Sequence, residues 1–309
     1  MSDTKTERNN IKKRIFYCNI TYGCNSNCIF CYSHNTWHNS IPHKEIDIDS
    51  YIEYLANNDI CESDRIIVNG GEPILHSRIA ELLERLNLLG CEVLVYTNGR
   101  LLTKLNLEML SERFRFIVPI HGFQVLHDKI TGVNGSYAET IRGLQYITKP
   151  ESKCRVDIKI IINGDMVSDH EQFQYTLDSL TSVPLNNAVH ITKMADTIIS
   201  QKNNCESIND EIASEYTRKL YDYYAENYKV KIFDTCIKGM KDLVPGEIDT
   251  HCLPLKVYFK DLNQEYIVNL EKPIMACMDK CELSKKCQTA VGEYTTLEFW
   301  NHDVYIELE

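Results

Sequence analysis

The feature that most constrains the fold is a regular alternation of short β-rich runs with longer amphipathic stretches between residues 14 and 192. This is the pattern of repeated βα units with parallel strands, and apolar runs such as 154–163 indicate strands that are buried on both faces. Six such units can form a partial barrel or an open doubly wound sheet, and the pattern alone leaves both possibilities open. The six predicted strands are 14–20, 65–69, 92–98, 115–121, 154–163 and 188–192.

The segments between these strands carry helical periodicity. In the stretch 76–90, Leu82, Leu83 and Leu86 recur at helical spacing, and Gly90 is a suitable residue to end the helix. Each helix of this kind connects one predicted strand to the next. The other predicted helices lie near 47–57, 103–112, 137–148 and 168–181.

The alternation ends after residue 192. A polar stretch leads into a long predicted helix at 211–228, and a hairpin-like pair of strands follows at 255–270, with DLNQ as its turn. We therefore expect a second, smaller unit that begins near residue 230. The expected divisions are a polar N-terminal segment (1–13), the βα unit (14–200), a bridging helix region (201–229) and a C-terminal α+β unit (230–309).

Charge and hydropathy exclude several kinds of partner. The 44 acidic and 33 basic residues give a formal net charge of -11, which disfavours nucleic acid because phosphate binding needs clustered positive charge. The chain has no run of about eighteen apolar residues and its N-terminal residues are polar, so we expect neither a membrane span nor a signal peptide. We expect a cytoplasmic protein that acts on small molecules or peptides.

The thirteen cysteines are a second constraint, and their number makes metal binding the interpretation to test. Cys24, Cys28 and Cys31 directly follow the first predicted strand, at the strand end where α/β proteins place their active sites. A structural zinc site needs four protein ligands, whereas three thiolates on a four-iron cluster leave one iron free for a substrate or cofactor. Ligand counting therefore favours a 4Fe-4S cluster. The alternatives are a chance cluster of thiols and a zinc site with one distant ligand.

The stretch CNSNCIFC at 24–31 resembles the signature of the radical S-adenosylmethionine (radical SAM) superfamily, including the aromatic Phe30 before the last cysteine. The resemblance implies an α/β fold, a partial (β/α)6 TIM-like barrel, in which Cys24, Cys28 and Cys31 hold a 4Fe-4S cluster that binds S-adenosyl-L-methionine (SAM). In this superfamily an electron from the cluster cleaves SAM to methionine and a 5′-deoxyadenosyl radical, which abstracts a hydrogen atom from the substrate. A flavodoxin- or ferredoxin-type reductant is the expected electron donor.

A second motif, NGGEP at 69–73, follows the second predicted strand. Its glycines, Gly70 and Gly71, allow the backbone to approach a ligand closely, and Glu72 offers a carboxylate to an ammonium group. Alone this would be an ordinary turn, but the resemblance implies that it binds the amino group of the methionine moiety. Weaker resemblances at later strand ends extend the expected cofactor site to Thr97, Asn98, His121 and Asn163, for which a turn or cap role is the alternative.

Two further histidines are expected to have structural roles. His127, with Asp128, is expected in a loop that organises the barrel rim. His190 lies inside a predicted strand and is expected to be a hydrogen-bonded core residue.

The last quarter of the chain holds five cysteines. Together with the hairpin, they resemble the auxiliary-cluster extensions of radical SAM enzymes, which are the SPASM domain and its shortened form, Twitch. A full SPASM domain needs seven or more cysteines for two clusters, so five imply one auxiliary Fe-S cluster. The alternatives are a structural zinc site and a spare thiol that donates a hydrogen atom. The five residues are Cys236, Cys252, Cys277, Cys281 and Cys287.

These patterns predict a radical SAM enzyme. Within the resemblance, enzymes with such tails crosslink, epimerise or oxidise ribosomal peptides during natural-product maturation, or they oxidise small sugars, alcohols or nucleosides. No leader-peptide-binding module is recognised before residue 14, which keeps the small-molecule alternative open. A non-catalytic Fe-S or zinc regulator is a third alternative, which NGGEP disfavours because a sensor needs no methionine-binding loop.

Overall fold

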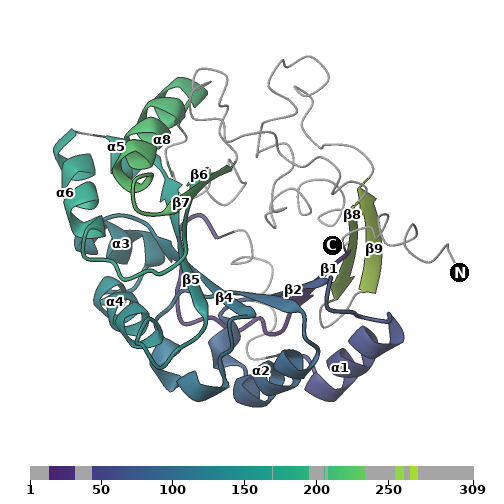
Figure 1. Ribbon diagram of the computed structural model, residues 1–309. Helices are drawn as coiled ribbons and strands as arrows, with labels where there is room; N and C mark the ends of the chain where they lie inside the picture. Colours follow the sequence, from purple (N-terminus) through teal and green to yellow (C-terminus); the bar gives the residue numbers. More distant parts are fainter. Residues whose placement is uncertain are drawn as a thin grey trace, which may run out of the picture.

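The sheet of this protein is a partial barrel. The computed structural model describes residues 14–31, 44–168, 170–194, 205, 208–233, 255–260 and 265–270, and the nine strands in this part form one sheet in the order β7-β6-β5-β4-β3-β2-β1-β8-β9. Strands β1 to β7 are parallel and adjacent in sequence order, and Figure 1 shows the helices on the convex outer side of the curved sheet. A doubly wound sheet would reverse its strand order and carry helices on both faces. The α/β partial barrel is therefore confirmed and the open sheet is excluded.

The strands are β1 (Arg14–Asn19), β2 (Arg65–Asn69), β3 (Glu92–Tyr96), β4 (Phe114–Ile120), β5 (Arg155–Ile162), β6 (Ala188–Lys193), β7 (Lys229–Phe233), β8 (Leu255–Lys260) and β9 (Glu265–Leu270). The α-helices are α1 (Ile48–Asn57), α2 (Ile79–Leu88), α3 (Gln124–Thr131), α4 (Ser136–Ile147), α5 (Gly164–Val167), α6 (His170–Leu180) and α8 (Asp210–Tyr224). Three short 3-10 turns are η3 (Pro73–Leu75), η4 (Leu102–Lys104) and η5 (Leu107–Met109). No helix in the described part of the chain is both long and apolar enough to cross a bilayer.

The six predicted strands agree with β1 to β6 to within two residues at each end. The pattern did not predict β7, which follows α8 and pairs in parallel with β6. Its sequence, KVKIF, alternates lysine with apolar residues, so it lacks the continuous apolar run of the central strands.

The helix predicted near 103–112 is wrong, because this segment forms the two 3-10 turns η4 and η5. Leu105 and Asn106 between them have extended backbone, with ψ values of 144° and 116°. The Asn106 side chain accepts a hydrogen bond from the Glu108 N–H, which starts a new turn and prevents one continuous helix.

The rim loop predicted around His127 and Asp128 is also wrong, because both residues lie in helix α3. Asp128 holds the start of α4 by accepting hydrogen bonds from the Gly135 N–H at 2.6 Å and the Tyr137 N–H at 2.8 Å. The sequence gives little sign of α3, because its N-cap residue, Phe123, has no side chain that can cap a helix.

Each strand presents alternate side chains to the helices and to the concave side of the sheet. On β4, Phe116, Val118 and Ile120 are completely buried in the core between sheet and helices. The residues that alternate with them along the strand, such as Arg115 and Pro119, therefore face the concave side. This alternation decides which side chains can reach a bound molecule inside the barrel.

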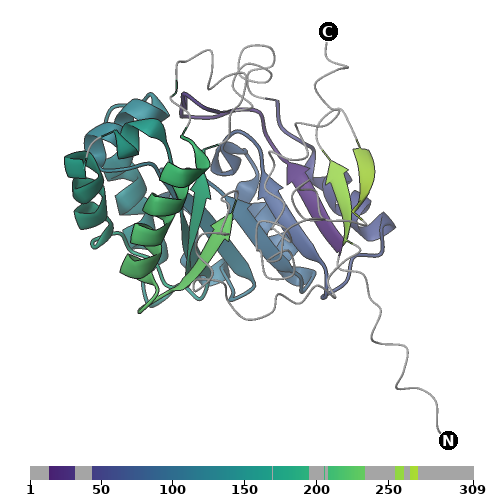
Figure 2. The same cartoon turned by 90° about the horizontal axis from the view of Figure 1, so that it is seen from above.

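The predicted hairpin is present and extends the barrel sheet. Strands β8 and β9 pair antiparallel, and β8 pairs in parallel with β1, with Ile15 opposite Val257. Tyr258 of β8 stacks on Phe16 of β1, with ring centroids 4.5 Å apart. Figure 2 shows this pair at the end of the sheet away from α8. The strand that leads to the first cysteine cluster is thus an interior strand of the sheet.

Candidate functional site

Cys24, Cys28 and Cys31 lie in the loop that leaves β1, which we call the cysteine loop (residues 20–31). Because β1 to β6 are parallel, this loop sits at the edge of the sheet where the other strands also end. The Cys31 N–H donates to the Cys28 carbonyl at 3.0 Å and closes a tight turn between these two residues. All three thiols are therefore at the carboxyl-terminal edge of the barrel.

The thiols are close enough to influence one another's ionisation. Burial, followed by the charges of Glu72 and Cys31, raises the pKa of Cys24 to about 12. Burial raises the pKa of Cys28 well above its ordinary value, and the charges of Cys31 and Cys24 raise it further. As free side chains, Cys24 and Cys28 are therefore protonated at neutral pH. A bound metal centre supplies the positive charge that stabilises them as thiolates.

The donor chemistry of the cysteine loop fits an iron-sulfur cluster. Three thiols on one short loop match the thiolate ligation of such clusters. In the described ranges, no group of three or more His, Cys, Asp or Glu side chains is already arranged around a metal position. The fit therefore rests on the type and spacing of the donors.

Gly70 and Gly71 bring the loop after β2 against the cysteine loop. An added Cβ at Gly71 would lie 2.2 Å from the Gly23 carbonyl oxygen, and one at Gly70 would lie 2.4 Å from that of Thr21. Two backbone hydrogen bonds join the segments, from the Gly71 N–H to Thr21 at 2.8 Å and from the Glu72 N–H to Gly23 at 2.7 Å. The close approach that glycine permits here is to the cysteine loop, and binding of the methionine moiety stays a prediction.

Glu72 is completely buried, and its carboxylate accepts three hydrogen bonds from the chain itself. Oε1 accepts from Thr97 Oγ1 at 2.6 Å and from the Ile74 N–H at 3.1 Å, and Oε2 accepts from the Asn98 N–H at 2.7 Å. Burial raises the pKa of Glu72 above its ordinary value, although these hydrogen bonds act in the opposite direction. The Glu72 carboxylate therefore joins the loops after β2 and β3. The ammonium group of a bound methionine moiety would have to share the Glu72 oxygens with these three donors.

Asn98 and Arg100, which follow β3, hold the first half of the cysteine loop. Asn98 Nδ2 donates to Asn25 Oδ1 at 2.6 Å. Arg100 donates to the Asn25 carbonyl and, at 3.2 Å, to Ser26 Oγ, while an ion pair of 2.6 Å with Glu139 orients its guanidinium. The sequence pattern does not single out Arg100, whose only signal is its place directly after YTNG at a strand end.

The end of α3 holds the second half of the cysteine loop. The Asn27 N–H donates to the Thr131 carbonyl at 2.8 Å, and the Ile29 N–H donates to that of Ile130 at 2.9 Å. Gly132 ends α3 in the left-handed region with a φ of 66°, and an added Cβ there would lie 2.8 Å from the Asn27 carbonyl oxygen. The cysteine loop is thus held by backbone contacts on two sides.

Phe30, the aromatic residue of the cysteine motif, packs edge-on against His121, with ring centroids 5.2 Å apart. His121 follows β4 and is buried, and within the described residues its Nδ1 has no hydrogen-bond partner. Burial lowers the pKa of His121 well below its ordinary value, and the charges of His127 and Lys159 lower it further. His121 is therefore a neutral imidazole beside the cysteine loop.

Asn163 has the cap role that was the alternative to cofactor binding. Its Oδ1 accepts from the Met166 N–H at 3.0 Å at the start of α5. It also borders a small cavity between the cysteine loop and the ends of β5 and β6. The residues that line this cavity of about 10 Å³ include Ile29, Phe30, Ile130, Asn163, Met194 and Cys205.

The predicted cofactor residues thus fall into two groups. Thr97 and Asn98 gather around Glu72, whereas Phe30 lies with His121 and with the cavity beside Asn163. The five C-terminal cysteines lie outside the described residues, so the auxiliary cluster stays a prediction. They are Cys236, Cys252, Cys277, Cys281 and Cys287.

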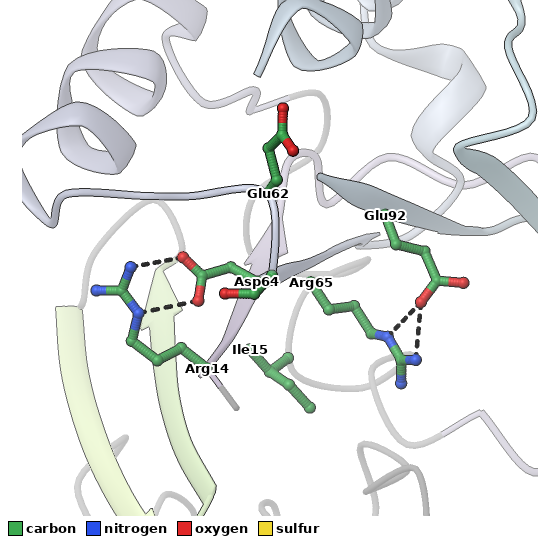
Figure 3. Close-up of a pocket in the computed structure, with 7 residues that line it drawn as sticks. Arg14, Ile15, Glu62, Asp64, Arg65 and Glu92 are labelled. Atoms are coloured by element: carbon green, nitrogen blue, oxygen red, sulfur yellow. Dashed lines mark hydrogen bonds and ion pairs between the residues drawn. The ribbon is translucent and has the colours of Figure 1, made fainter. Parts of the chain in front are cut away.

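A larger cavity, of about 240 Å³, lies at the opposite edge of the sheet, where β1, β2 and β3 begin (Figure 3). Two ion pairs dominate it, Arg14 with Asp64 at 2.5 Å and Arg65 with Glu92 at 2.7 Å. None of the predicted cofactor residues lines this cavity, so it is separate from the cysteine loop. Its lining residues are Arg14, Ile15, Glu62, Ser63, Asp64, Arg65 and Glu92.

Two curated relatives come from Methanosarcina barkeri. The AdoMet-dependent heme synthase is 27% identical over 150 residues, which are 48% of this chain and 42% of that protein. The Fe-coproporphyrin III synthase is 23% identical over 264 residues, which are 82% of this chain and 60% of that protein. The chain therefore spans less than two thirds of the length of either relative.

A solved structure with the same fold is that of Streptococcus suis SuiB bound to S-adenosylmethionine. It has a TM-score of 0.63 at 14% identity and covers 88% of this chain and 71% of SuiB. The sequence profile of the Radical SAM superfamily matches residues 18–173, just over half of the 309 residues, and includes the cysteine loop and NGGEP. The chain therefore belongs to the radical SAM superfamily.

Proposed function

We propose that this chain reductively cleaves SAM and abstracts a hydrogen atom from its substrate. Membership of the superfamily implies a 4Fe-4S cluster and SAM as cofactors. The observation that best supports the proposal is the cysteine loop, with three thiols at the carboxyl edge of the barrel and a backbone held on two sides. When bound, the cluster and SAM supply an electron and a 5′-deoxyadenosyl radical.

The role of the chain's own residues in this reaction is to hold and position the cluster. Cys24, Cys28 and Cys31 would ligate it. Asn98 and Arg100 would keep the loop in place through Asn25 and Ser26, at contacts of 2.6 to 3.2 Å. A flavodoxin- or ferredoxin-type protein is the reductant that we propose.

Anaerobic reconstitution and a cleavage assay test this proposal. Wild-type protein with dithionite and SAM should form 5′-deoxyadenosine and methionine in equal amounts. Cys31→Ser should form neither, because two thiolates do not hold the cluster. Cys61→Ser is the matched control, since Cys61 is exposed and lies close to Arg14, at the opposite edge of the sheet. If reconstituted wild-type protein left SAM intact, the catalytic proposal would fail and the regulator alternative would be favoured.

We further propose that the expected C-terminal unit, residues 230–309, carries a SPASM- or Twitch-like extension with one auxiliary Fe-S cluster, although β7, β8 and β9 within this range pair with the barrel sheet. The support is the group of five cysteines in that region. Reconstituted wild-type protein should bind about eight irons per chain, and the Cys31→Ser variant about four. About four irons and one zinc in wild-type protein would instead support the structural zinc alternative.

For the substrate, we propose a ribosomal peptide that is crosslinked, epimerised or oxidised. The support is SuiB, which shares the fold over 90% of this chain in its structure with the precursor peptide SuiA. A short precursor peptide encoded next to this protein would strengthen this assignment. Adding that peptide should raise 5′-deoxyadenosine formation above the rate without substrate and change the peptide mass.

The second candidate is the oxidation of a small molecule. The specific support is the alignment with Fe-coproporphyrin III synthase, which extends over 82% of this chain. In that case a precursor of Fe-coproporphyrin III, and not a peptide, should raise 5′-deoxyadenosine formation. Mass spectrometry of the products distinguishes the two candidates, because only the true substrate is converted as SAM is consumed.

A further inference from the structure

A segment of residues 44–46, which we call the strap, closes the base of the cysteine loop. Glu45 in the strap forms an isolated antiparallel β-bridge with Thr21. Beside this bridge, the Ile46 N–H donates to the Ile20 carbonyl at 2.9 Å. The strap thus pairs with the cysteine loop just after the loop leaves β1.

A second backbone hydrogen bond completes the pairing, because the Tyr22 N–H donates to the Lys44 carbonyl at 3.1 Å. The chain therefore leaves the bridge at Tyr22 and returns to it at Lys44. All three cysteines of the motif lie between these two points of the sequence. The strap consequently fixes both ends of the chain segment that carries the thiols.

The side chain of His76 connects the strap to the segment after NGGEP. His76 is buried, its Nε2 lies 2.9 Å from the Ile46 carbonyl oxygen, and its Nδ1 accepts a hydrogen bond from the Arg78 N–H at 3.1 Å. A carbonyl oxygen only accepts and a backbone N–H only donates, so the proton of the ring is on Nε2. The two ring nitrogens therefore have separate partners, one in the strap and one at the start of α2.

The next residue, Ser77, holds the strap through Glu45. Glu45 Oε1 accepts from the Ser77 N–H at 2.9 Å, and Oε2 accepts from Ser77 Oγ at 2.5 Å. These contacts are at the surface, whereas the contact of His76 with Ile46 is buried. A buried carbonyl that loses its donor costs more than an exposed one, so His76 makes the stronger of the two attachments.

The segment 70–77 therefore contacts the chain on both sides of the cysteines. Its first half donates backbone hydrogen bonds to Thr21 and Gly23, before the first cysteine. Its last two residues, His76 and Ser77, hold the strap, which follows the last cysteine of the motif. The same short segment thus sets the separation of the two ends of the cysteine-bearing chain.

We infer that His76 is a positioning residue for the cysteine loop: its Nε2–H fixes the Ile46 carbonyl, and the strap in turn holds Ile20 and Tyr22. This inference rests on the proposed function, because the loop matters for catalysis only as the ligand of the 4Fe-4S cluster. It assigns to His76 an effect on how firmly the loop retains iron, transmitted through the strap and not through contact with the cofactors.

Two substitutions separate the two contacts of His76. The amide nitrogen of glutamine is as many bonds from Cβ as Nε2 of histidine, and the amide oxygen of asparagine is as many bonds from Cβ as Nδ1. His76→Gln therefore keeps the donor to Ile46 and loses the acceptor for Arg78, whereas His76→Asn keeps the acceptor and loses the donor. Each variant is the matched control for the other.

Hydrogen–deuterium exchange of the full-length protein, resolved to single amides, measures how firmly the strap is held. In His76→Asn the amides of Tyr22 and Ile46 should exchange at least about tenfold faster than in wild type, because a buried carbonyl loses its donor. In His76→Gln both amides should stay within about threefold of the wild-type rate. The amide of Val95 in β3 should exchange at the wild-type rate in both variants.

Iron release from reconstituted protein to a chelator is the second readout. His76→Asn should release iron at least about fivefold faster than wild type, and His76→Gln should not. Glu45→Ala keeps the test open if the buried substitution prevents folding, because it removes the surface contacts of the strap with Ser77. It should speed exchange at Ile46 about threefold.

Four results would overturn the inference: equal exchange at Ile46 in the two His76 variants, faster exchange at Val95 together with Tyr22, wild-type exchange at Ile46 in Glu45→Ala, or wild-type iron release from His76→Asn. Exchange is measured in metal-free and in reconstituted protein, so this readout does not depend on SAM. If wild-type protein left SAM intact, the proposed function would fail, while the exchange rates would still decide the role of His76.

Discussion

Replacing Gly71 with alanine should move the cysteine loop away from the loop after β2. The added Cβ would lie 2.2 Å from the Gly23 carbonyl oxygen and 2.9 Å from that of Tyr22, so backbone atoms have to separate by about 1 Å to restore van der Waals contact. That movement breaks the hydrogen bonds from Gly71 to Thr21 at 2.8 Å and from Glu72 to Gly23 at 2.7 Å.

The structure sets the expected size of the effect. Two lost backbone hydrogen bonds cost about 1 to 3 kcal/mol and the overpacking a similar amount, so the free energy of unfolding should fall by about 2 to 6 kcal/mol. A displacement of about 1 Å in a catalytic loop can cost about a hundredfold in rate. We therefore expect at least about a tenfold slower formation of 5′-deoxyadenosine, even at temperatures where Gly71→Ala remains folded.

Anaerobic urea unfolding followed by circular dichroism measures the free energy of unfolding. Iron content and the rate of SAM cleavage report whether the cysteine loop still holds its position. Gly135→Ala is the control, because Gly135 has a φ of 83° but an added Cβ meets nothing within 4 Å. Backbone strain there should cost about 1 kcal/mol and leave iron binding unchanged. If folded Gly71→Ala bound iron and cleaved SAM at the wild-type rate, the reasoning that glycine positions the cysteine loop would be refuted.

Three further changes have defined outcomes. The hydrogen bond from His190 lowers the pKa of Asp157, although burial acts in the opposite direction. The ionised carboxylate therefore stabilises the fold above about pH 4, and this stabilisation is lost as the pH falls through the lower pKa of the folded state. Asp157→Asn should lower the free energy of unfolding by about 3 kcal/mol at pH 7, and urea titrations at several pH values should show a weaker loss of stability in acid than for wild type. Asp128→Ala removes the acceptor at the start of α4 and should cost about 1 to 2 kcal/mol by thermal unfolding, with SAM cleavage as the check that the site is retained. Arg100→Gln should release iron to a chelator several-fold faster than wild type, whereas Arg113→Gln at the other edge of the sheet should not, and equal release rates would contradict the role given to Arg100.

The alternation of apolar strands and amphipathic segments was enough to predict the barrel, because burial on both faces makes each central strand a continuous apolar run. The exceptions have local causes. Strand β7 contains Lys229 and Lys231, which reduces its apolar signal, and α3 begins without a capping side chain. The break at Asn106 depends on a side-chain hydrogen bond that no periodicity reveals.

For the site, the cysteine spacing and the strand-end glycines were readable from the sequence, because they involve residues close together in the chain. The contacts that hold the cysteine loop were not. Arg100 reaches Ser26 and Gly132 packs on Asn27 across the top of the barrel, and such distant pairs follow only from the assembled sheet. The three hydrogen bonds that occupy Glu72 are likewise a product of the fold.

The parallel pairing of β8 with β1 has a consequence for how this protein is made. The ribosome releases Ile15 early, but its partner Val257 follows only after the whole βα unit has been synthesised. Until then the strand that carries the cysteine loop has one open edge, and long-range pairing of this kind forms slowly. The nascent chain therefore presents the thiols of the cysteine loop beside an unpaired strand edge. An iron-sulfur cluster delivered before β8 is made would reach a loop whose strand, β1, is paired only with β2.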